Sequence, residues 1–241
     1  MKCEAQNVIG VPVRGLIGDG FEVLPAVLSA AQCGFLLNEL SPLFEQQQAS
    51  ARTRLGGLRH LLRASPSVGE LAHSKQLTGM LTSRLGHGVR PVRALFFDKT
   101  PDTNWSVPWH QDLTIAIAER IDTPGFSGWS AKHGIFHVQP PAEVLERMVT
   151  IRLHLDACGS DNGALKIIPG SHRHGKLDTA AIAEWTQQPV CTCSVPQGGA
   201  LLMCPLLLHS SSPATTPSHR RVLHIEYTTV ELPNGLKWFA S

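Results

Sequence analysis

The chain has 241 residues, of which 42% are hydrophobic and 17% are charged, and this composition excludes an intrinsically disordered protein. Its 21 Lys and Arg residues against 19 Asp and Glu residues give a formal net charge of +2, so neither a nucleic-acid nor a membrane partner is expected. Twelve histidines stand out, because histidine titrates near neutral pH and is the commonest metal ligand. Their number makes a metal site the first hypothesis.

The ends of the chain and its cysteines indicate where the protein resides. Residues 1–7 are polar and lack the apolar core of a signal peptide. The longest apolar run, residues 200–208, contains Pro205 and is less than half of the roughly twenty residues that a membrane-spanning helix needs. The cysteines form no C-x-x-C pair, which favours reduced thiols. We expect a soluble, cytoplasmic protein.

The first 88 residues have a mainly helical pattern. A short strand is predicted at residues 20–25, and Ser29 is a suitable N-cap for the helix that follows. Helical spacing continues over residues 58–85, where the Ser65-Pro66-Ser67 sequence predicts a break.

From residue 89 onward the sequence favours short strands separated by Pro, Gly and Asn. Residues 148–156 alternate most clearly, with apolar side chains on one face and polar side chains on the other. The Asp161-Asn162-Gly163 sequence predicts a hairpin turn whose return strand covers residues 164–169. A further strand is predicted at residues 200–209, after a Gly-Gly turn.

These elements predict one domain over residues 1–241. Its class is mainly β with an N-terminal helical layer (α+β), in which the helical part at 1–88 packs on a β core at 89–230. Many short strands of this kind are typical of a closed or double-sheet β architecture.

Among the common catalytic motifs, the sequence lacks a phosphate-binding glycine loop and the H-E-x-x-H zinc motif. The His110-Gln111-Asp112 sequence remains. Side chains at i and i+2 of an extended strand point the same way, so His110 and Asp112 can share one ion. A third ligand from a distant strand would complete a two-His-one-carboxylate Fe(II) site. By itself, H-x-D often occurs by chance, and such a pair is usually a surface or hydrogen-bonded pair.

Three other residues suit such a site. His209 ends an apolar strand, and Arg220 follows it across a proline-containing loop, where a guanidinium group would hold a carboxylate through two hydrogen bonds. A buried core histidine and a solvated arginine are the alternatives. Arg152 lies on the polar face of residues 148–156, where it requires an anion if buried and otherwise is solvated or paired with Asp156.

Several short motifs occur together in a specific order over roughly residues 97–227, and this combination resembles the phytanoyl-CoA dioxygenase family. The motifs are Trp109-His110-Gln111-Asp112, residues 161–165 and 168–172, and His209 followed by Arg220. The resemblance implies a double-stranded β-helix (jelly-roll) core, with Fe(II) as cofactor and 2-oxoglutarate and O₂ as cosubstrates. It further implies iron ligands at His110, Asp112 and His209, and a 2-oxoglutarate carboxylate site at Arg220 and Ser211.

The reaction that the resemblance implies is hydroxylation of a small molecule, coupled to decarboxylation of 2-oxoglutarate to succinate and CO₂. Residues 119–146 resemble a variable lid over the substrate, and His133, His137 and Arg152 are candidate substrate-binding residues. No cluster of basic residues suited to the phosphates of coenzyme A stands out, which argues against an acyl-CoA substrate. The sequence identifies neither the substrate nor the oligomeric state.

Three alternatives make different demands on the sequence. A cupin-type metal enzyme without 2-oxoglutarate would not need Arg220, and a non-catalytic 2-oxoglutarate or metal sensor would keep the fold without turnover. A structural zinc protein would need a closed set of four Cys or His ligands, which the spacing does not provide. The combination of His110, Asp112, His209 and Arg220 favours the dioxygenase.

Overall fold

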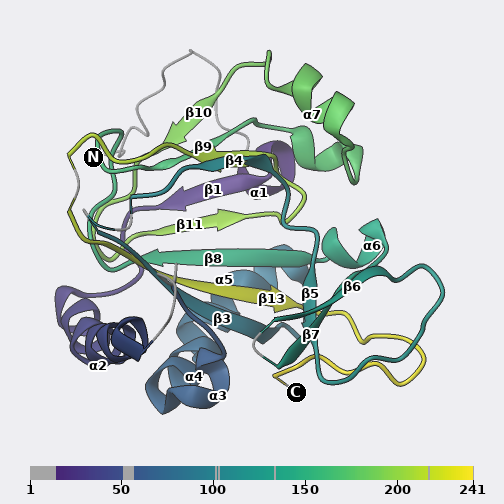
Figure 1. Ribbon diagram of the computed structural model, residues 1–241, viewed down its shortest axis with the longest axis horizontal. Helices are drawn as coiled ribbons and strands as arrows, with labels where there is room; N and C mark the ends of the chain where they lie inside the picture. The colour runs from purple at the N-terminus through teal and green to yellow at the C-terminus, as the bar shows by residue number, and fades with distance from the viewer. Residues whose placement is uncertain are drawn as a thin grey trace.

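A computed structural model describes residues 15–50, 57–100, 102, 104–132, 134–216 and 218–240 of the chain. Its first part is mainly helical and its second part consists mostly of strands (Figure 1), as the periodicity of the sequence predicts. No helix within these ranges combines the length and the apolar character needed to cross a bilayer. The N-terminal elements are α1 (Gly15–Asp19), β1 (Phe21–Leu24), α2 (Ala30–Ser50), β2 (Gly57–Leu58), α3 (Leu61–Ala64), α4 (Pro66–His73) and α5 (Lys75–Leu85).

Side-chain caps mark the starts of α2, α4 and α5. The Ser29 hydroxyl accepts a hydrogen bond from the Gln32 backbone N–H (3.2 Å), and the Gln32 side chain accepts one from the Ser29 N–H (2.9 Å). This reciprocal pair is a capping box, and it confirms the predicted start of α2. Ser65 caps α4 at the predicted break, and Ser74 caps α5 at a second break that the sequence analysis did not place.

The strands of the whole described chain, including β1 and β2, form three antiparallel sheets. Their strand orders are β1-β11-β8-β13-β3-β2, β10-β9-β12-β4 and β5-β7-β6. The elements are β3 (Arg90–Lys99), β4 (Val107–His110), β5 (Ile115–Ile117), β6 (Ser127–Lys132), β7 (Ile135–Gln139), α6 (Ala142–Leu145), β8 (Met148–His154), β9 (Leu165–Ile167), the 3₁₀ helix η2 (Ser171–His174), α7 (Thr179–Trp185), β10 (Cys191–Cys193), β11 (Ala200–Met203), β12 (His209–Ser211) and β13 (Arg220–Thr228).

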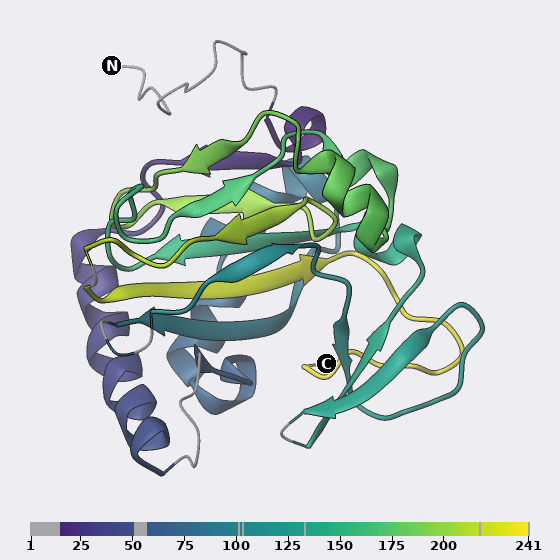
Figure 2. The ribbon, with the colours of Figure 1, turned by 45° about the horizontal axis from the view of Figure 1, so that its top comes forward.

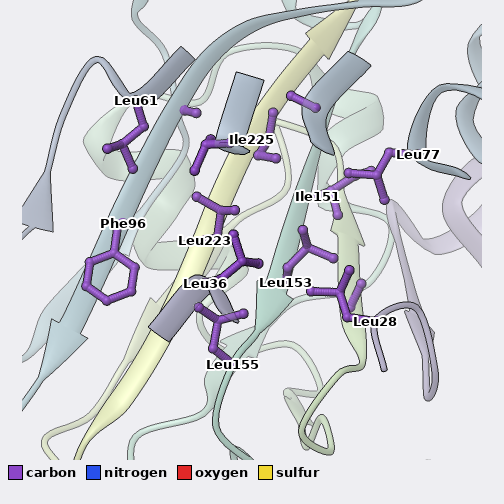
Figure 3. Packing of buried hydrophobic residues seen from close by; sticks show 14 of the residues in the cluster. Leu28, Leu36, Leu61, Leu77, Phe96, Ile151, Leu153, Leu155, Leu223 and Ile225 are labelled. Carbon is purple, nitrogen blue, oxygen red and sulfur yellow. The ribbon is translucent and has the colours of Figure 1, made fainter. Parts of the chain in front are cut away.

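One face of the six-stranded sheet packs against the N-terminal helices. Ile151 and Leu153 of β8 and Leu223 of β13 are fully buried there, in contact with helical leucines such as Leu36 and Leu77 (Figure 3). Burying one such side chain contributes about 1.5–3 kcal/mol, so this face holds the main core of the fold. The intervening residues of each strand point to the opposite face.

The opposite face of the six-stranded sheet packs against the four-stranded sheet. Phe21 of β1 and Leu201 of β11 share a buried cluster with Ile167 of β9 and Cys193 of β10. The core therefore lies between two β layers on this side and between a β layer and helices on the other (Figure 2). The five cysteines that the structure describes are free thiols.

Two predictions of local strand order are wrong. The return strand after Asn162, β9, pairs with β10 and β12 rather than with β8, because the chain crosses here from one sheet to the other. Asn162 stabilises that crossing by accepting a hydrogen bond from the Gly159 N–H and donating one to the Ala157 carbonyl. The predicted strand 200–209 is likewise divided into β11 and β12, which belong to different sheets.

The segment 119–146 contains two strands and a helix. Its strands β6 and β7 pair with each other, and β7 also pairs with β5, so that a three-stranded sheet lies beside the C-terminal residues (Figure 1). The Phe239 N–H donates to the Ala116 carbonyl at 3.1 Å, which joins the chain end to this sheet. Helices α6 and α7 were not predicted; Asp178 caps α7 through the Ala181 N–H.

Candidate metal centre

Three ligand-type side chains meet where the two main sheets face each other. His110 is the last residue of β4, Asp112 follows it in the next loop, and His209 opens β12, directly opposite His110 in the strand register. The Asp112 carboxylate lies 3.9 Å from His110 Nε2 and 3.8 Å from His209 Nε2. One ligand atom from each residue lies within 4.8 Å of the other two, which is a spacing that one metal ion can bridge.

Backbone carbonyls orient both imidazole rings toward this point. His110 Nδ1 lies 2.9 Å from the Pro108 carbonyl, and His209 Nδ1 lies 2.8 Å from the Leu207 carbonyl. A carbonyl can only accept a hydrogen bond, so each ring carries its proton on Nδ1 and leaves the Nε2 lone pair free. Hydrogen bonding of the second nitrogen in this way is typical of metal-binding histidines.

The electrostatics of the site favour the protonation states that metal binding requires. Burial lowers the pKa of His209 to about 4, so its imidazole is neutral at neutral pH. Burial by itself raises the pKa of Asp112, but the nearby imidazoles of His209, His224 and His110, together with the Arg152 guanidinium, outweigh that effect and lower it. At neutral pH the site therefore presents the neutral imidazole of His209 beside the carboxylate of Asp112.

A network of charged side chains lines the six-stranded sheet opposite the three residues. Arg152 Nη1 lies 3.0 Å from Nδ1 of His224, and His224 Nε2 lies 3.5 Å from the Glu226 carboxylate. Arg93 completes the network by donating to Glu226 at 3.0 Å. Arg152 remains protonated, although burial and the charge of Arg220 lower its pKa to about 10.

Two more cations, Lys99 and Arg220, lie on the six-stranded sheet. Lys99 and Arg220 are opposite each other on β3 and β13, and both are almost completely buried. Lys99 Nζ donates to the Ser211 hydroxyl (3.3 Å) and the Ser212 carbonyl (3.0 Å), while Arg220 donates to the Gly163 carbonyl. Burial, with a smaller contribution from the charge of Arg220, lowers the pKa of Lys99 to about 8.

Several polar atoms in this space have no partner among the residues that the structure describes. Arg152 Nε, Arg220 Nε and both ring nitrogens of His154 are buried without a hydrogen bond. Buried charges and donors in folded proteins normally have partners, so this excess of cations indicates a place for an anion. A carboxylate would supply the missing acceptors for Arg152 and Arg220.

The structure brings most of the predicted site residues together. His110, Asp112 and His209 form one cluster, and Arg220, Ser211 and Arg152 line the adjoining space. The suggested pairing of Arg152 with Asp156 is wrong, because Asp156 forms a two-point ion pair with Arg221 on the outer face. His137 is buried on β7, where its Nδ1 lies 3.1 Å from the Ile135 carbonyl, and His133 lies outside the described residues.

Sequence analysis missed Lys99, His224 and Glu226. Arg220, His224 and Glu226 alternate with apolar residues along β13, so period-two spacing places all three on the face that carries the site. That signal was available in the sequence. Lys99 ends β3 without a comparable pattern, and only the pairing of β3 with β13 shows where it lies.

A family model described as phytanoyl-CoA dioxygenase (PhyH) matches residues 18–222 of the chain. A comparison with curated proteins finds no match. Among solved structures, EctD from S. alaskensis with bound Fe is similar at 20% identity and a TM-score of 0.69, covering 98% of this chain and 85% of EctD.

Two other solved structures have similar folds. AviO1 from Streptomyces viridochromogenes Tue57 is 23% identical, with a TM-score of 0.65 and coverage of 91% of this chain and 94% of AviO1. The epimerase SnoN in complex with Fe3+, alpha ketoglutarate and nogalamycin RO is 17% identical, with a TM-score of 0.68 and coverage of 91% and 88%. At these identities the likeness establishes the fold, and two of the three structures contain iron.

Proposed function

The chain belongs to the phytanoyl-CoA dioxygenase (PhyH) family, and on that premise we propose that it is an Fe(II)- and 2-oxoglutarate-dependent dioxygenase that hydroxylates a small molecule. Fe(II) is the cofactor of this class, and 2-oxoglutarate and O₂ are its cosubstrates. The single observation that supports the proposal most strongly is the convergence of His110, Asp112 and His209 within 4.8 Å, beside a buried space with an excess of positive charge.

We propose that His110, Asp112 and His209 hold the iron. Two imidazoles and one carboxylate suit Fe(II) and leave coordination positions open for cosubstrates. The hydrogen bonds from Nδ1 to the Pro108 and Leu207 carbonyls keep the two rings aimed before any metal binds. When bound, the iron supplies the activation of O₂ for oxidation of a C–H bond, with electrons from decarboxylation of 2-oxoglutarate.

We further propose that Arg220 and Ser211 hold the distal carboxylate of 2-oxoglutarate, with Lys99 as an added cationic anchor. Arg220 is buried without an acidic partner among the described residues, and its Nε is unused. A bound carboxylate would accept hydrogen bonds from Arg220, Lys99 and the Ser211 hydroxyl at once. Charge-assisted hydrogen bonds of this kind orient the cosubstrate and displace water from the space.

The two facing sheets suit a double-stranded β-helix (jelly-roll), and we assign this topology to the core. Arg152 lies on β8, near enough to Asp112 for its charge to lower the pKa of that carboxyl. We propose that Arg152 contacts either the cosubstrate or the substrate. His137 and His133 belong to the segment 119–146, which we propose covers the substrate side.

The similar structures point to more than one kind of reaction. SnoN is an epimerase, and a structure of EctD contains 2-oxoglutarate together with 5-hydroxyectoine. Hydroxylation adds one oxygen atom to the substrate, whereas epimerisation leaves its mass unchanged. We favour hydroxylation for this chain on the strength of its membership in the dioxygenase family.

The experiment is a screen of metabolite pools for release of succinate, with mass spectrometry of the compound that is consumed. The proposal predicts substrate-dependent succinate and a product heavier by one oxygen atom. A product of unchanged mass would favour an epimerase, and turnover without 2-oxoglutarate would favour a cupin-type enzyme. Binding of metal and 2-oxoglutarate without any turnover across the screen would favour a sensor.

A further inference from the structure

Gln111, the residue between two of the three metal-site residues, has a fully engaged side chain. It is buried, and a buried amide is unfavourable unless its N–H groups and its oxygen have partners. Nε2 donates to the Leu206 carbonyl (2.7 Å) and to the Gly175 carbonyl (2.9 Å), and Oε1 accepts from the Leu177 N–H (2.8 Å). The amide therefore joins three segments of the chain at one point.

These partners determine what Gln111 can do. A carbonyl only accepts and a backbone N–H only donates, so the partners also fix which end of the amide carries the nitrogen. Both N–H groups of Nε2 are committed to carbonyls, and Oε1 is directed at an N–H. The side chain thus binds the backbone and not a metal ion, and its effect on the metal centre runs through the segments that it joins.

The turn between β11 and β12 is where the two halves of the metal site meet. The Pro205 carbonyl accepts a hydrogen bond from the Asp112 N–H at 2.9 Å. The Leu207 carbonyl accepts one from Nδ1 of His209 at 2.8 Å. The carbonyl between these two is the one that Gln111 holds. Three consecutive carbonyls therefore fix the loop that carries one ligand and the ring of another.

The turn itself is a firm support. The buried Ser171 hydroxyl accepts a hydrogen bond from the Leu208 N–H at 2.9 Å and donates one to the Ile168 carbonyl at 2.8 Å. The Ile168 N–H in turn donates to the Leu208 carbonyl at 3.0 Å. A turn held on this side can transfer its position to the loop that Gln111 ties to it.

The strand ladder gives the same junction less support. Strands β4 and β12 pair at His110 and His209, and the register shifts directly beyond that pair, between His209 and Ser211. Asp112 lies past the end of β4, so no ladder hydrogen bond holds its loop. The link through Gln111 and the Asp112 N–H therefore determines how far the carboxylate lies from the two rings.

We propose that Gln111 is a positioning residue of the metal centre, which sets the separation between the loop of His110 and Asp112 and the turn before His209. The inference rests on the proposed function, because it concerns the same three ligands. It adds a residue that is ready before metal binds and that contacts none of the ligand atoms. Groups that orient metal ligands from behind typically change metal affinity by about 10–100-fold.

The test measures metal binding and coordination, not turnover. The full chain, freed of metal with a chelator, is titrated anaerobically with Co(II), whose visible absorption bands report coordination geometry as well as binding. Gln111→Met keeps the approximate volume and removes every hydrogen bond of the amide. We expect it to weaken Co(II) binding by about 10–100-fold and to change the shape of the bands. Gln111→Asn keeps an amide that is one methylene shorter, and we expect an intermediate affinity.

Gln197→Met is the matched control. Gln197 also donates through Nε2 to a backbone carbonyl, that of Leu155, at 2.9 Å, but neither residue belongs to the segments around the metal site. This variant is expected to bind Co(II) as the unaltered chain does. Urea unfolding of the metal-free proteins measures the stability that each substitution costs, and near-ultraviolet circular dichroism checks that each variant is folded. A merely structural role of Gln111 would lower stability and leave the bands as they are.

Each outcome decides the question. Weaker binding with altered bands in Gln111→Met, together with normal binding in Gln197→Met, supports the proposal. Unchanged affinity and bands in Gln111→Met overturn it, even where stability falls; if this variant does not fold, the same criteria are applied to Gln111→Asn. An equal loss in Gln197→Met also overturns it, because any lost glutamine hydrogen bond would then have the effect.

Failure of the proposed function has a different signature. The unaltered chain would then bind Co(II) no better than Asp112→Ala does, and the positioning role would fall together with the ligand assignment. If the unaltered chain binds Co(II) in an Asp112-dependent way and Gln111→Met binds it equally well, only the role of Gln111 is overturned.

Discussion

The two faces of the six-stranded sheet differ sharply although consecutive residues build them. On β8, Ile151 and Leu153 point to the helices and are fully buried among apolar side chains. Arg152 and His154 alternate with them along the strand and are also buried, but they point to the face that carries the metal residues. One face stabilises the fold, and the other holds charges that do not satisfy one another.

This difference shows how stability and function are divided in the chain. Burying apolar surface contributes to the free energy of unfolding, whereas burying unpaired polar groups subtracts from it. The helix-facing side therefore has to offset the charged side. Substitutions on the two faces should accordingly separate loss of function from loss of stability.

The largest effect is expected at the metal centre. Asp112→Ala removes the only carboxylate of the three-residue cluster, so we expect metal binding and succinate production to be lost together. The free energy of unfolding should change little, because Asp112 packs in no apolar cluster. Metal analysis and a succinate assay measure the first effect, and denaturant unfolding measures the second. Near-normal turnover in this variant would contradict the ligand assignment.

The apolar face should show the opposite behaviour. Leu153→Ala creates a cavity beneath the helices and is expected to reduce the free energy of unfolding by about 2–5 kcal/mol. At temperatures where the variant remains folded, metal binding should be unchanged. The measurement is urea unfolding followed by circular dichroism.

The matched control for that prediction is the adjacent residue on the other face. Arg152→Met replaces a buried guanidinium by an apolar side chain, which we expect to leave the free energy of unfolding equal or higher. A large destabilisation in Arg152→Met, with little in Leu153→Ala, would show that the division between the faces is wrong.

A smaller effect is expected at Lys99. Lys99→Met removes one of the cations around Ser211 and should raise the KM for 2-oxoglutarate by about tenfold, while kcat changes less. Because the pKa of Lys99 is about 8, its charge is lost as the pH rises through that value. The KM of the unaltered enzyme should therefore increase between pH 7 and pH 9, and the KM of Lys99→Met should stay flat. Equal pH profiles would exclude Lys99 from the cosubstrate site.

The smallest effect concerns a hydrogen bond between the sheet and a helix. The buried Tyr227 hydroxyl donates to the Ala72 carbonyl of α4 at 2.9 Å. Tyr227→Phe should lower the free energy of unfolding by about 1 kcal/mol and leave 2-oxoglutarate binding unaltered. Thermal and urea unfolding both measure this change; an effect on cosubstrate affinity would mean that the two faces are coupled through β13.

Much of the fold and of the candidate site could be predicted from local sequence. The N-cap at Ser29 and the alternation of residues 148–156 are encoded by neighbouring residues, and both are confirmed. The crossing after Asn162 could not be predicted in this way, because a turn sequence does not specify which sheet receives the next strand.

The same limit explains the missed site residues. His110 and Asp112 are two residues apart, so their shared position follows from strand geometry. Lys99 and Arg220 are more than a hundred residues apart, and only the pairing of β3 with β13 brings them together.

The measurement that tests the central claim most directly is an anaerobic titration of the protein with Fe(II) and then with 2-oxoglutarate. We predict a weak visible absorption band of the iron–2-oxoglutarate chelate in the unaltered chain. The band should be absent in Asp112→Ala and should require higher 2-oxoglutarate in Lys99→Met. Iron bound without any such band, or an unchanged band in Asp112→Ala, would contradict the assignment of this site.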